Sequence, residues 1–386
     1  MNMRIILRTT ILTIFYFCFW GIVNAGDTPP SEWKVLSREA IRLHEQREFR
    51  QAAVLSQRAL EAAEKNLGTE HPDVASLLDN LAQHHFMLGD HRSAETLYLR
   101  ALAIREKESE STPLALANAL NNLAVLYFQQ KEYAKAAPLY ERALKTKMEA
   151  LGPEHPSVAT NLNNIAELLR VQGYHAKAAS LQQRALAIKE KTLGPNHPDL
   201  AANLDILARL QYLQGDYAQA AALLERALHI WEALPPEQHA SKIPDILTGL
   251  AACSLSLGDP DTAERHIRKA LHLQQNTFGA LQPEISRSLH ILASIHARRG
   301  EYAEAERLVT QALSIQETAL GPNHPSVAKS LTKLAQLQRA QGAYAKAVPL
   351  VIRARAIGRM HVASQQTIAP VSYADPAETP WEILPQ

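Results

Sequence analysis

The chain has 386 residues, enough for two or three average domains, and 46% of them are hydrophobic. Its 40 Lys and Arg nearly balance its 39 Asp and Glu. This neutral balance argues against a nucleic-acid partner, which usually requires a clearly basic surface. The apolar residues are mostly Ala and Leu, which are strong helix formers. We therefore expect an all-α protein.

The first 25 residues differ from the rest of the chain. Arg4 and Arg8 precede an apolar run over 11–23, and the small residue Ala25 precedes a possible cleavage site. This pattern is typical of a secretory signal peptide, and the run is short for a membrane span, which needs about 20 apolar residues. The alternative is that the segment is not cleaved and anchors the protein in the membrane. We expect no other membrane contact. Cleavage would leave the single cysteine Cys253, compatible with a periplasmic or secreted protein.

Alanine recurs along the chain with a period of 42 residues. Three positions, represented by Ala82, Ala94 and Ala101, are Ala in each of eight units, and one extra residue falls within 234–244. Two helices in a tight antiparallel hairpin need small side chains where their backbones approach. We therefore predict eight helix hairpins, over about 32–66, 67–108, 109–150, 151–192, 193–235, 236–277, 278–319 and 320–361.

The ends of the predicted helices carry their own signals. A turn with Gly, as at Gly89 and Gly215, or with Lys131 in the same place, separates the two helices of a unit, and Gly suits a left-handed cap. Leu-Gly-x-x-His-Pro recurs between units, as over 151–156 and 193–198. Gly ends the second helix there, and Pro suits the first turn of the next helix.

The spacing of small residues, with Arg-Ala-Leu nearby, resembles the tetratricopeptide repeat. The 42-residue period, the Leu-Gly-x-x-His-Pro segments and the sequences at 121–124 and 163–166 resemble the kinesin light chain subtype. The resemblance covers about 32–361 and implies an all-α, right-handed superhelical solenoid with its first helices lining a concave groove. No kinesin-binding heptad segment precedes the repeats, so only the repeat itself carries over, and it serves many unrelated binding roles.

The predicted groove offers two kinds of polar side chain. Asparagines fall on its stripe, and the resemblance implies that such amides bond the backbone of an extended peptide, because an amide both donates and accepts. Cations follow further along, which favours an acidic ligand. Both sets could instead be ordinary solvated residues. The predicted peptide-binding residues are Asn80, Asn121, Asn122, Asn163, Asn164, Asn203, Arg170, Arg209, Arg287 and Lys329, with Arg298, Lys333 and Arg339 as further cations on the stripe.

The sequence gives little support to an enzyme. It contains no glycine-rich phosphate loop, Gly-x-Ser-x-Gly or Cys-x-x-Cys motif, so we expect no catalytic residue, cofactor or metal site. Of its 16 His, several belong to the His-Pro motif, and others, such as His85 and His296, occupy the position of Tyr127 in another unit. We interpret these as packing residues. We likewise expect Cys253 to be a buried core residue rather than a reactive thiol.

The last unit and the tail differ from the rest. Arg355 replaces a Leu present in the other seven units, which suits a polar cap, and residues 362–386 contain four Pro, so we expect a disordered tail. Trp381, beside acids, resembles the acidic tryptophan peptides that kinesin light chains bind. A free tail and a tail whose residues 378–384 dock in the groove both remain open.

The most favoured function is an exported scaffold that binds an extended, acidic segment of another protein. A structural assembly subunit, which would use the solenoid faces for oligomerisation, is the alternative.

Overall fold

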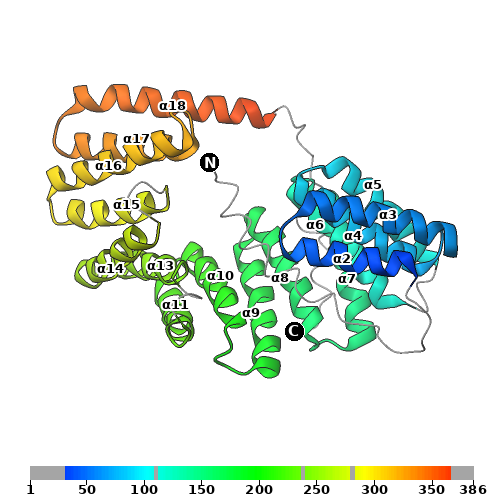
Figure 1. The fold of residues 1–386 in the computed structure, drawn as a ribbon. Coiled ribbons are helices and arrows are strands. Elements are labelled where there is room, and N and C mark those ends of the chain that lie inside the picture. The colour runs from blue at the N-terminus through cyan, green and yellow to red at the C-terminus, as the bar shows by residue number, and fades with distance from the viewer. Residues whose placement is uncertain (1–30, 108–111, 236–239, 279–282, 367–386) are drawn as a thin grey trace. The chain divides into compact units, whose positions relative to one another are not determined.

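The computed structural model describes residues 31–107, 112–235, 240–278 and 283–366 (Figure 1). Within these ranges all regular structure is helical, with sixteen helices and no strand. The predicted signal segment and the tail from residue 367 onward lie outside them. No helix in the described ranges is long and apolar enough to cross a membrane.

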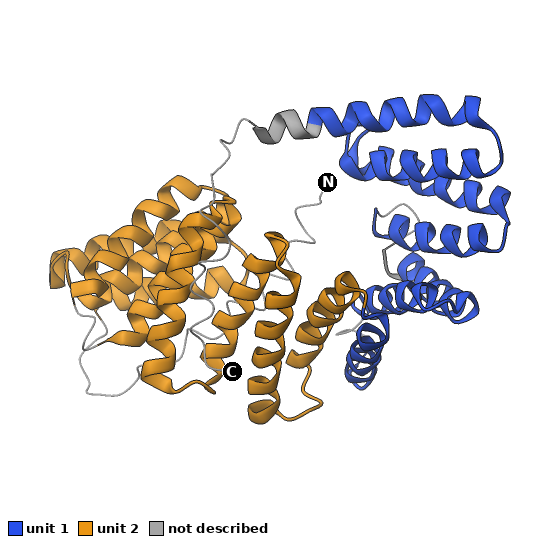
Figure 2. Ribbon diagram, turned by 180° about the vertical axis from the view of Figure 1, so that it is seen from behind, with its two compact units in different colours: residues 1–4, 216–386 blue, residues 5–215 orange. Residues whose placement is uncertain are grey.

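The helices belong to two compact units that divide between Gly215 and Asp216 (Figure 2). Each unit consists of helices that pack in succession along the chain. The N-terminal unit contains α2 (Glu32–Glu45), α3 (Phe49–Leu67), α4 (Pro72–Leu88), α5 (His91–Lys107), α6 (Pro113–Gln129), α7 (Tyr133–Leu151), α8 (Pro156–Val171), α9 (His175–Leu193) and α10 (Asp199–Gln214). The C-terminal unit contains α11 (Tyr217–Glu232), α13 (Ile243–Ser256), α14 (Pro260–Phe278), α15 (Pro283–Arg298), α16 (Tyr302–Leu320), α17 (Pro325–Ala340) and α18 (Tyr344–Gln366).

The periodic alanines lie in the helix contacts, as the sequence predicts. Ala82 on α4 and Ala94 and Ala101 on α5 are fully buried, and all 24 alanines of the three positions are buried. Within the units, α2 packs on α3, α4 on α5, α6 on α7, α8 on α9, α13 on α14, α15 on α16 and α17 on α18. The predicted fifth hairpin, α10 and α11, is divided between the two units.

The His-Pro motif forms helix caps. The Nδ1 atoms of His71, His155 and His324 each accept a hydrogen bond of 3.1 Å from the backbone amide two residues later, at the start of α4, α8 and α17. Each satisfies one of the amides that the first turn of a helix leaves without an intrahelical partner. These histidines therefore have the structural role expected from the sequence.

The turns inside the hairpins require left-handed backbone. Gly89 ends α4 with φ of 82°, and Lys131 takes the same role after α6 with φ of 64°. The second helix of the last hairpin differs from the prediction, because α18 continues past residue 361 to Gln366. Residues 362–366 contain no Pro or Gly, and the first Pro of the tail is Pro370. The helix is therefore free to continue over these residues.

Candidate functional site

The first helices of the N-terminal unit provide the surface on which the predicted asparagines lie. Helices α4 and α6 contact one another, and so do α6 and α8. Asn80 on α4 and Asn122 on α6 occupy equivalent positions 42 residues apart, and both are half-buried. Within the described residues, neither side chain has a hydrogen-bond partner, whereas a peptide backbone would supply both a donor and an acceptor.

Two other predicted asparagines are engaged inside the protein. The buried Asn164 on α8 donates to Oδ1 of Asn121 on α6 at 2.8 Å. The buried Asn203 on α10 donates to Oδ1 of Asn163 on α8 at 3.0 Å. These bonds join successive first helices. Asn164 and Asn203 therefore connect repeats, while the amide nitrogens of the half-buried Asn121 and Asn163 donate no hydrogen bond within the described residues.

A buried and a half-buried lysine complete this inter-repeat network, and sequence reasoning did not single them out. Lys147 on α7 is 5% exposed and donates to Oδ1 of the buried Asn161 at 2.9 Å. Lys189 on α9 donates to Oδ1 of Asn203 at 2.8 Å, and its burial lowers its pKa. The signal was present in the sequence, because both pairs are separated by 14 residues and lie 42 residues apart.

The C-terminal unit repeats the arrangement with uncharged groups. Ser330 on α17 donates to Oε1 of Gln316 on α16 at 2.6 Å, over the same separation of 14 residues. Its hydroxyl also lies 2.8 Å from Nε2 of His290 on α15. A polar contact between one second helix and the next first helix therefore recurs in both units, with different residue types.

The predicted cations of the N-terminal unit are paired with acids of their own helices. Arg170 forms a bidentate ion pair with Glu167, with N–O distances of 2.6 and 2.7 Å, and Arg209 forms an ion pair with Asp205 at 2.8 Å. The hydrogen bond that Arg170 donates to Glu167 also raises the pKa of Arg170. These acids neutralise much of the positive field that the sequence predicts for this surface.

The predicted cations of the C-terminal unit have mixed environments. Arg287 on α15 and Lys329 and Arg339 on α17 are exposed. Arg298 instead donates to the backbone carbonyl of Leu255. Lys333 donates to the Ser294 hydroxyl, and burial lowers its pKa. Of these predicted cations, Arg287, Lys329 and Arg339 are thus the most exposed to solvent.

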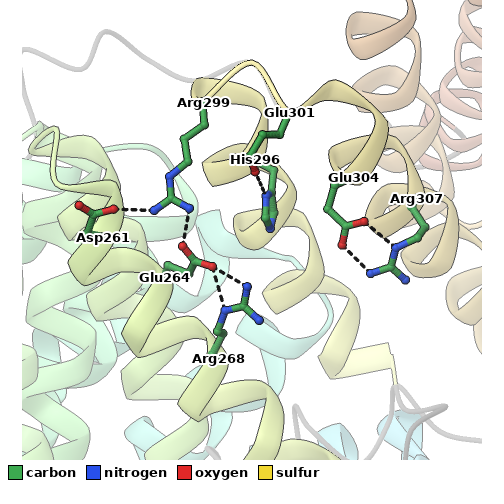
Figure 3. A network of polar contacts seen from close by, with 8 residues as sticks. All are labelled: Asp261, Glu264, Arg268, His296, Arg299, Glu301, Glu304 and Arg307. Atoms are coloured by element: carbon green, nitrogen blue, oxygen red, sulfur yellow. Dashed lines mark hydrogen bonds and ion pairs between the residues drawn. The ribbon is translucent and has the colours of Figure 1, made fainter.

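Other charges of this unit pair with each other at the junction of α14 with the following hairpin. Arg299 reaches from the end of α15 to Asp261 and Glu264 at 2.6 and 2.5 Å, and Arg268 also holds Glu264 (Figure 3). The Arg268 hydrogen bond is the main reason that the pKa of Glu264 is lowered. Because every member is paired, this cluster ties two repeats together and offers little to a ligand.

Cys253 and the histidines of the Tyr127 position are further reactive side chains of the described residues. Cys253 is buried, and burial raises the pKa of its thiol to about 11, which suppresses the thiolate. His85 and His296 each contact an acid in the following turn, Asp90 and Glu301 respectively. Within the described ranges, no group of three or more His, Cys, Asp or Glu is placed to hold a metal ion.

Comparisons with known proteins agree with this repeat architecture. The model of the tetratricopeptide repeat family matches residues 35–107, 115–191, 157–233, 242–318 and 285–359. BtubC (BKLC) from P. vanneervenii is similar, with 26% identity over 66% of this chain and 94% of that chain and a TM-score of 0.51. The comparison with curated proteins found no match.

Two further solved structures are similar to the chain. The apo form of the quorum sensor NprR from B. thuringiensis has a TM-score of 0.63 at 12% identity, over 84% of this chain and 87% of that chain. Kinesin light chain-like repeats from P. anserina are 29% identical over 55% of this chain and 98% of that chain, with a TM-score of 0.45.

Proposed function

The chain belongs to the tetratricopeptide repeat family, and from this premise we propose that it is an exported scaffold that binds an extended segment of another protein. The family assignment predicted from the sequence is confirmed, and the repeat is a protein-interaction module. The binding surface, the export and the ligand class are proposals. The site we assign is the first-helix face, defined as Asn80, Asn121, Asn122 and Asn163 on α4, α6 and α8.

The side-chain amides of Asn80 and Asn122 carry this proposal. They lie on neighbouring helices, one repeat apart, and no internal hydrogen bond engages them within the described residues. Each amide can donate to a backbone carbonyl and accept from a backbone N–H of an extended peptide. The rigid helices that hold them would lose little entropy on binding.

An acidic ligand is favoured by the C-terminal unit rather than by the first-helix face. Arg170 and Arg209 of the N-terminal unit are neutralised by their own helices, whereas Lys329 and Arg339 on α17 are exposed. Residues 325–366 contain seven Lys and Arg and no Asp or Glu. Acidic residues of a ligand would therefore gain most from contact with α17.

A capture experiment tests the assignment of the site. The full chain, the double variant Asn80→Ala/Asn122→Ala and the matched control Asn66→Ala/Asn196→Ala are used to capture proteins from an envelope extract. Both control asparagines are exposed outside the first helices. Each hydrogen bond contributes about 0.5–1.5 kcal/mol, so the loss of one bond at each asparagine should weaken binding roughly 5–150-fold. Equal capture by all three proteins would rule out this face.

Export is tested separately by the intact mass of the protein from its native envelope. Cleavage after Ala25 gives a chain that begins at Gly26. A membrane-embedded product that retains Met1 would contradict the proposed signal peptide.

A further inference from the structure

The last helix, α18, is anchored on one side only. Ala347, Ala354 and Ile357 are buried, with Ile357 in a core cluster shared with α17. Arg353 pairs with Glu317 of α16 at 2.6 Å. No later helix follows in the described part of the chain. The packing therefore fixes α18 and leaves another of its faces uncovered.

That uncovered face is apolar along much of its length. Tyr344, Val348 and Ile352 are 63%, 56% and 64% exposed, and they follow one another at intervals of four residues. Arg355 and Arg359, both exposed, lie seven residues after Val348 and Ile352 and so share their side of the helix. We name these five residues the α18 terminal face.

The terminal face departs from the pattern of the other repeats. Ile352 stands where the other second helices carry mostly polar residues, namely Gln57, Leu99, Glu141, Gln183, Glu225, Arg268 and Thr310. Arg355 replaces the Leu of the other seven units. Arg359 replaces a residue that is Glu in five of them, as in Glu317. A polar cap would not require an apolar residue such as Ile352 on this face. An exposed apolar surface beside two arginines instead suits a ligand that is both apolar and acidic.

We propose that the α18 terminal face binds the chain's own C-terminal segment, residues 371–386. The segment brings the apolar residues Trp381, Ile383 and Leu384 to Val348 and Ile352. Its acids, Asp375, Glu378 and Glu382, meet Arg355 and Arg359. The charges are complementary, because residues 367–386 contain three acids and no Lys or Arg, whereas 325–366 contain only cations.

The length of the connecting chain suits this contact. From Gln366 back to Ile352 the helix rises about 21 Å, at 1.5 Å per residue. The 15 residues from 367 to 381 have a root-mean-square span of roughly 19–23 Å as a flexible coil. Trp381 can therefore reach Ile352 without stretching the chain. Tethering gives an effective concentration in the mM range, so even a weak contact would be well populated.

Fluorine NMR of the full chain labelled with 5-fluorotryptophan tests this contact. Four Trp are present, and Trp381→Phe identifies the relevant signal. In the docked state this signal differs from that of a free 371–386 peptide. Ile352→Glu, and separately Arg355→Glu/Arg359→Glu, should lower the docked-to-free ratio at least tenfold. The control Lys346→Glu replaces an exposed cation by an acid two residues before Val348, on another side of α18, and should leave the ratio unchanged.

A tail variant covers the case in which a helix substitution disturbs folding. Glu378→Lys/Glu382→Lys changes no residue of the described helices and should release Trp381 to the same extent. High salt should act in the same direction, because it screens exposed charges.

Three outcomes would overturn the proposal. The first is a Trp381 signal identical to that of the free peptide at low salt. The second is a docked signal that grows with protein concentration while the chain sediments as a dimer, which would make a second copy the occupant. The third is docking that survives Ile352→Glu and Arg355→Glu/Arg359→Glu, which would place the tail elsewhere, including on the first-helix face.

Discussion

Asn164 and Asn121 lie one repeat apart and share a hydrogen bond of 2.8 Å between the Nδ2 of the first and the Oδ1 of the second. The bond joins α8 to α6, and Asn164 is buried. Asn122, the residue equivalent to Asn164 in the preceding repeat, is half-buried and has no such bond within the described residues. Equivalent positions of the repeat therefore differ, because Asn164 connects two helices and Asn122 does not.

This difference predicts opposite effects of the same substitution. Asn164→Ala leaves Oδ1 of Asn121 without its donor and should lower the free energy of unfolding by about 1–3 kcal/mol. Asn122→Ala should change stability by less than about 0.5 kcal/mol, the usual effect of a change that breaks no internal contact, but should weaken ligand capture. Urea unfolding of both variants measures the predicted difference in stability. Equal losses of stability would contradict the assignment of roles.

The Lys189–Asn203 contact should behave as a charge that needs its partner. Asn203→Leu removes the acceptor of a partly buried ammonium, and hydrogen bonds to charged groups contribute about 1.5–3 kcal/mol. Adding Lys189→Met removes the charge and should recover part of the loss, because apolar pairs of similar volume replace buried charges well. A double-mutant cycle in urea measures the coupling. Additive losses would mean that the two side chains do not depend on each other.

Acid should destabilise the N-terminal unit through His84. Burial, with His44 and His85 nearby, lowers the pKa of His84 to about 3, whereas an unfolded His titrates near 6.5. Between these values the unfolded chain binds the extra proton, so stability falls as the pH falls through this window. From pH 7 to pH 5 the loss is about 2 kcal/mol for this residue.

The variant His84→Gln isolates this titration. The substitution removes the titrating group while its amide can still bond the hydroxyl of Ser56, which lies 3.1 Å from Nδ1 of His84. Unfolding free energies at pH 7 and pH 5 should therefore differ by about 2 kcal/mol less than in the parent chain. The same substitution at the exposed His229 is the control and should leave the difference unchanged. An unaltered difference in His84→Gln would show that other groups cause the acid sensitivity.

The turn residues Gly89 and Lys131 predict changes of opposite sign. No atom lies within 4 Å of a Cβ built on Gly89, so Gly89→Ala costs only the strain of left-handed backbone, about 1–2 kcal/mol. Lys131 already bears that strain at φ of 64°, and Lys131→Gly should stabilise the chain by up to about 1 kcal/mol. Thermal unfolding of the two variants checks the signs. A destabilised Lys131→Gly would mean that its side chain contributes more than the turn strain costs.

The sequence predicts the fold almost completely because its alanine spacing is imposed by backbone approach. Side chains larger than Ala would force the helices apart at Ala82 or Ala94, so the pattern carries the hairpin directly. Site geometry is less visible in the sequence. Adjacent asparagines such as Asn163 and Asn164 differ by 100° around the helix, and which of them meets a neighbouring repeat depends on how the repeats pack.

The last helix, α18, is a second example of a feature that the sequence alone does not reveal. Arg355 alone suggests a polar cap, but the structure also leaves Val348 and Ile352 uncovered. Val348 is exposed, whereas its equivalents in the other repeats, such as Ala53 and Ala179, are buried or half-buried beside a following hairpin. No hairpin follows α18 in the described part of the chain, and a comparison of single positions does not reveal this. The position of Ile352 is exposed in most other repeats as well, so only its apolar character is unusual. The signal peptide and the ligand-binding role of the asparagines remain predictions.

The polar contacts between repeats limit how this chain can gain or lose repeats by recombination. Removing residues 151–192 would bring Lys147 beside Asn203 and preserve a lysine–asparagine contact at the new junction. Removing 67–150 would instead bring Ala63 beside Asn161, whose buried Oδ1 now accepts from Lys147. An amide left without its donor destabilises the fusion, although the hairpins themselves are intact. The repeats are alike in backbone but not interchangeable, so their order is part of what the sequence encodes.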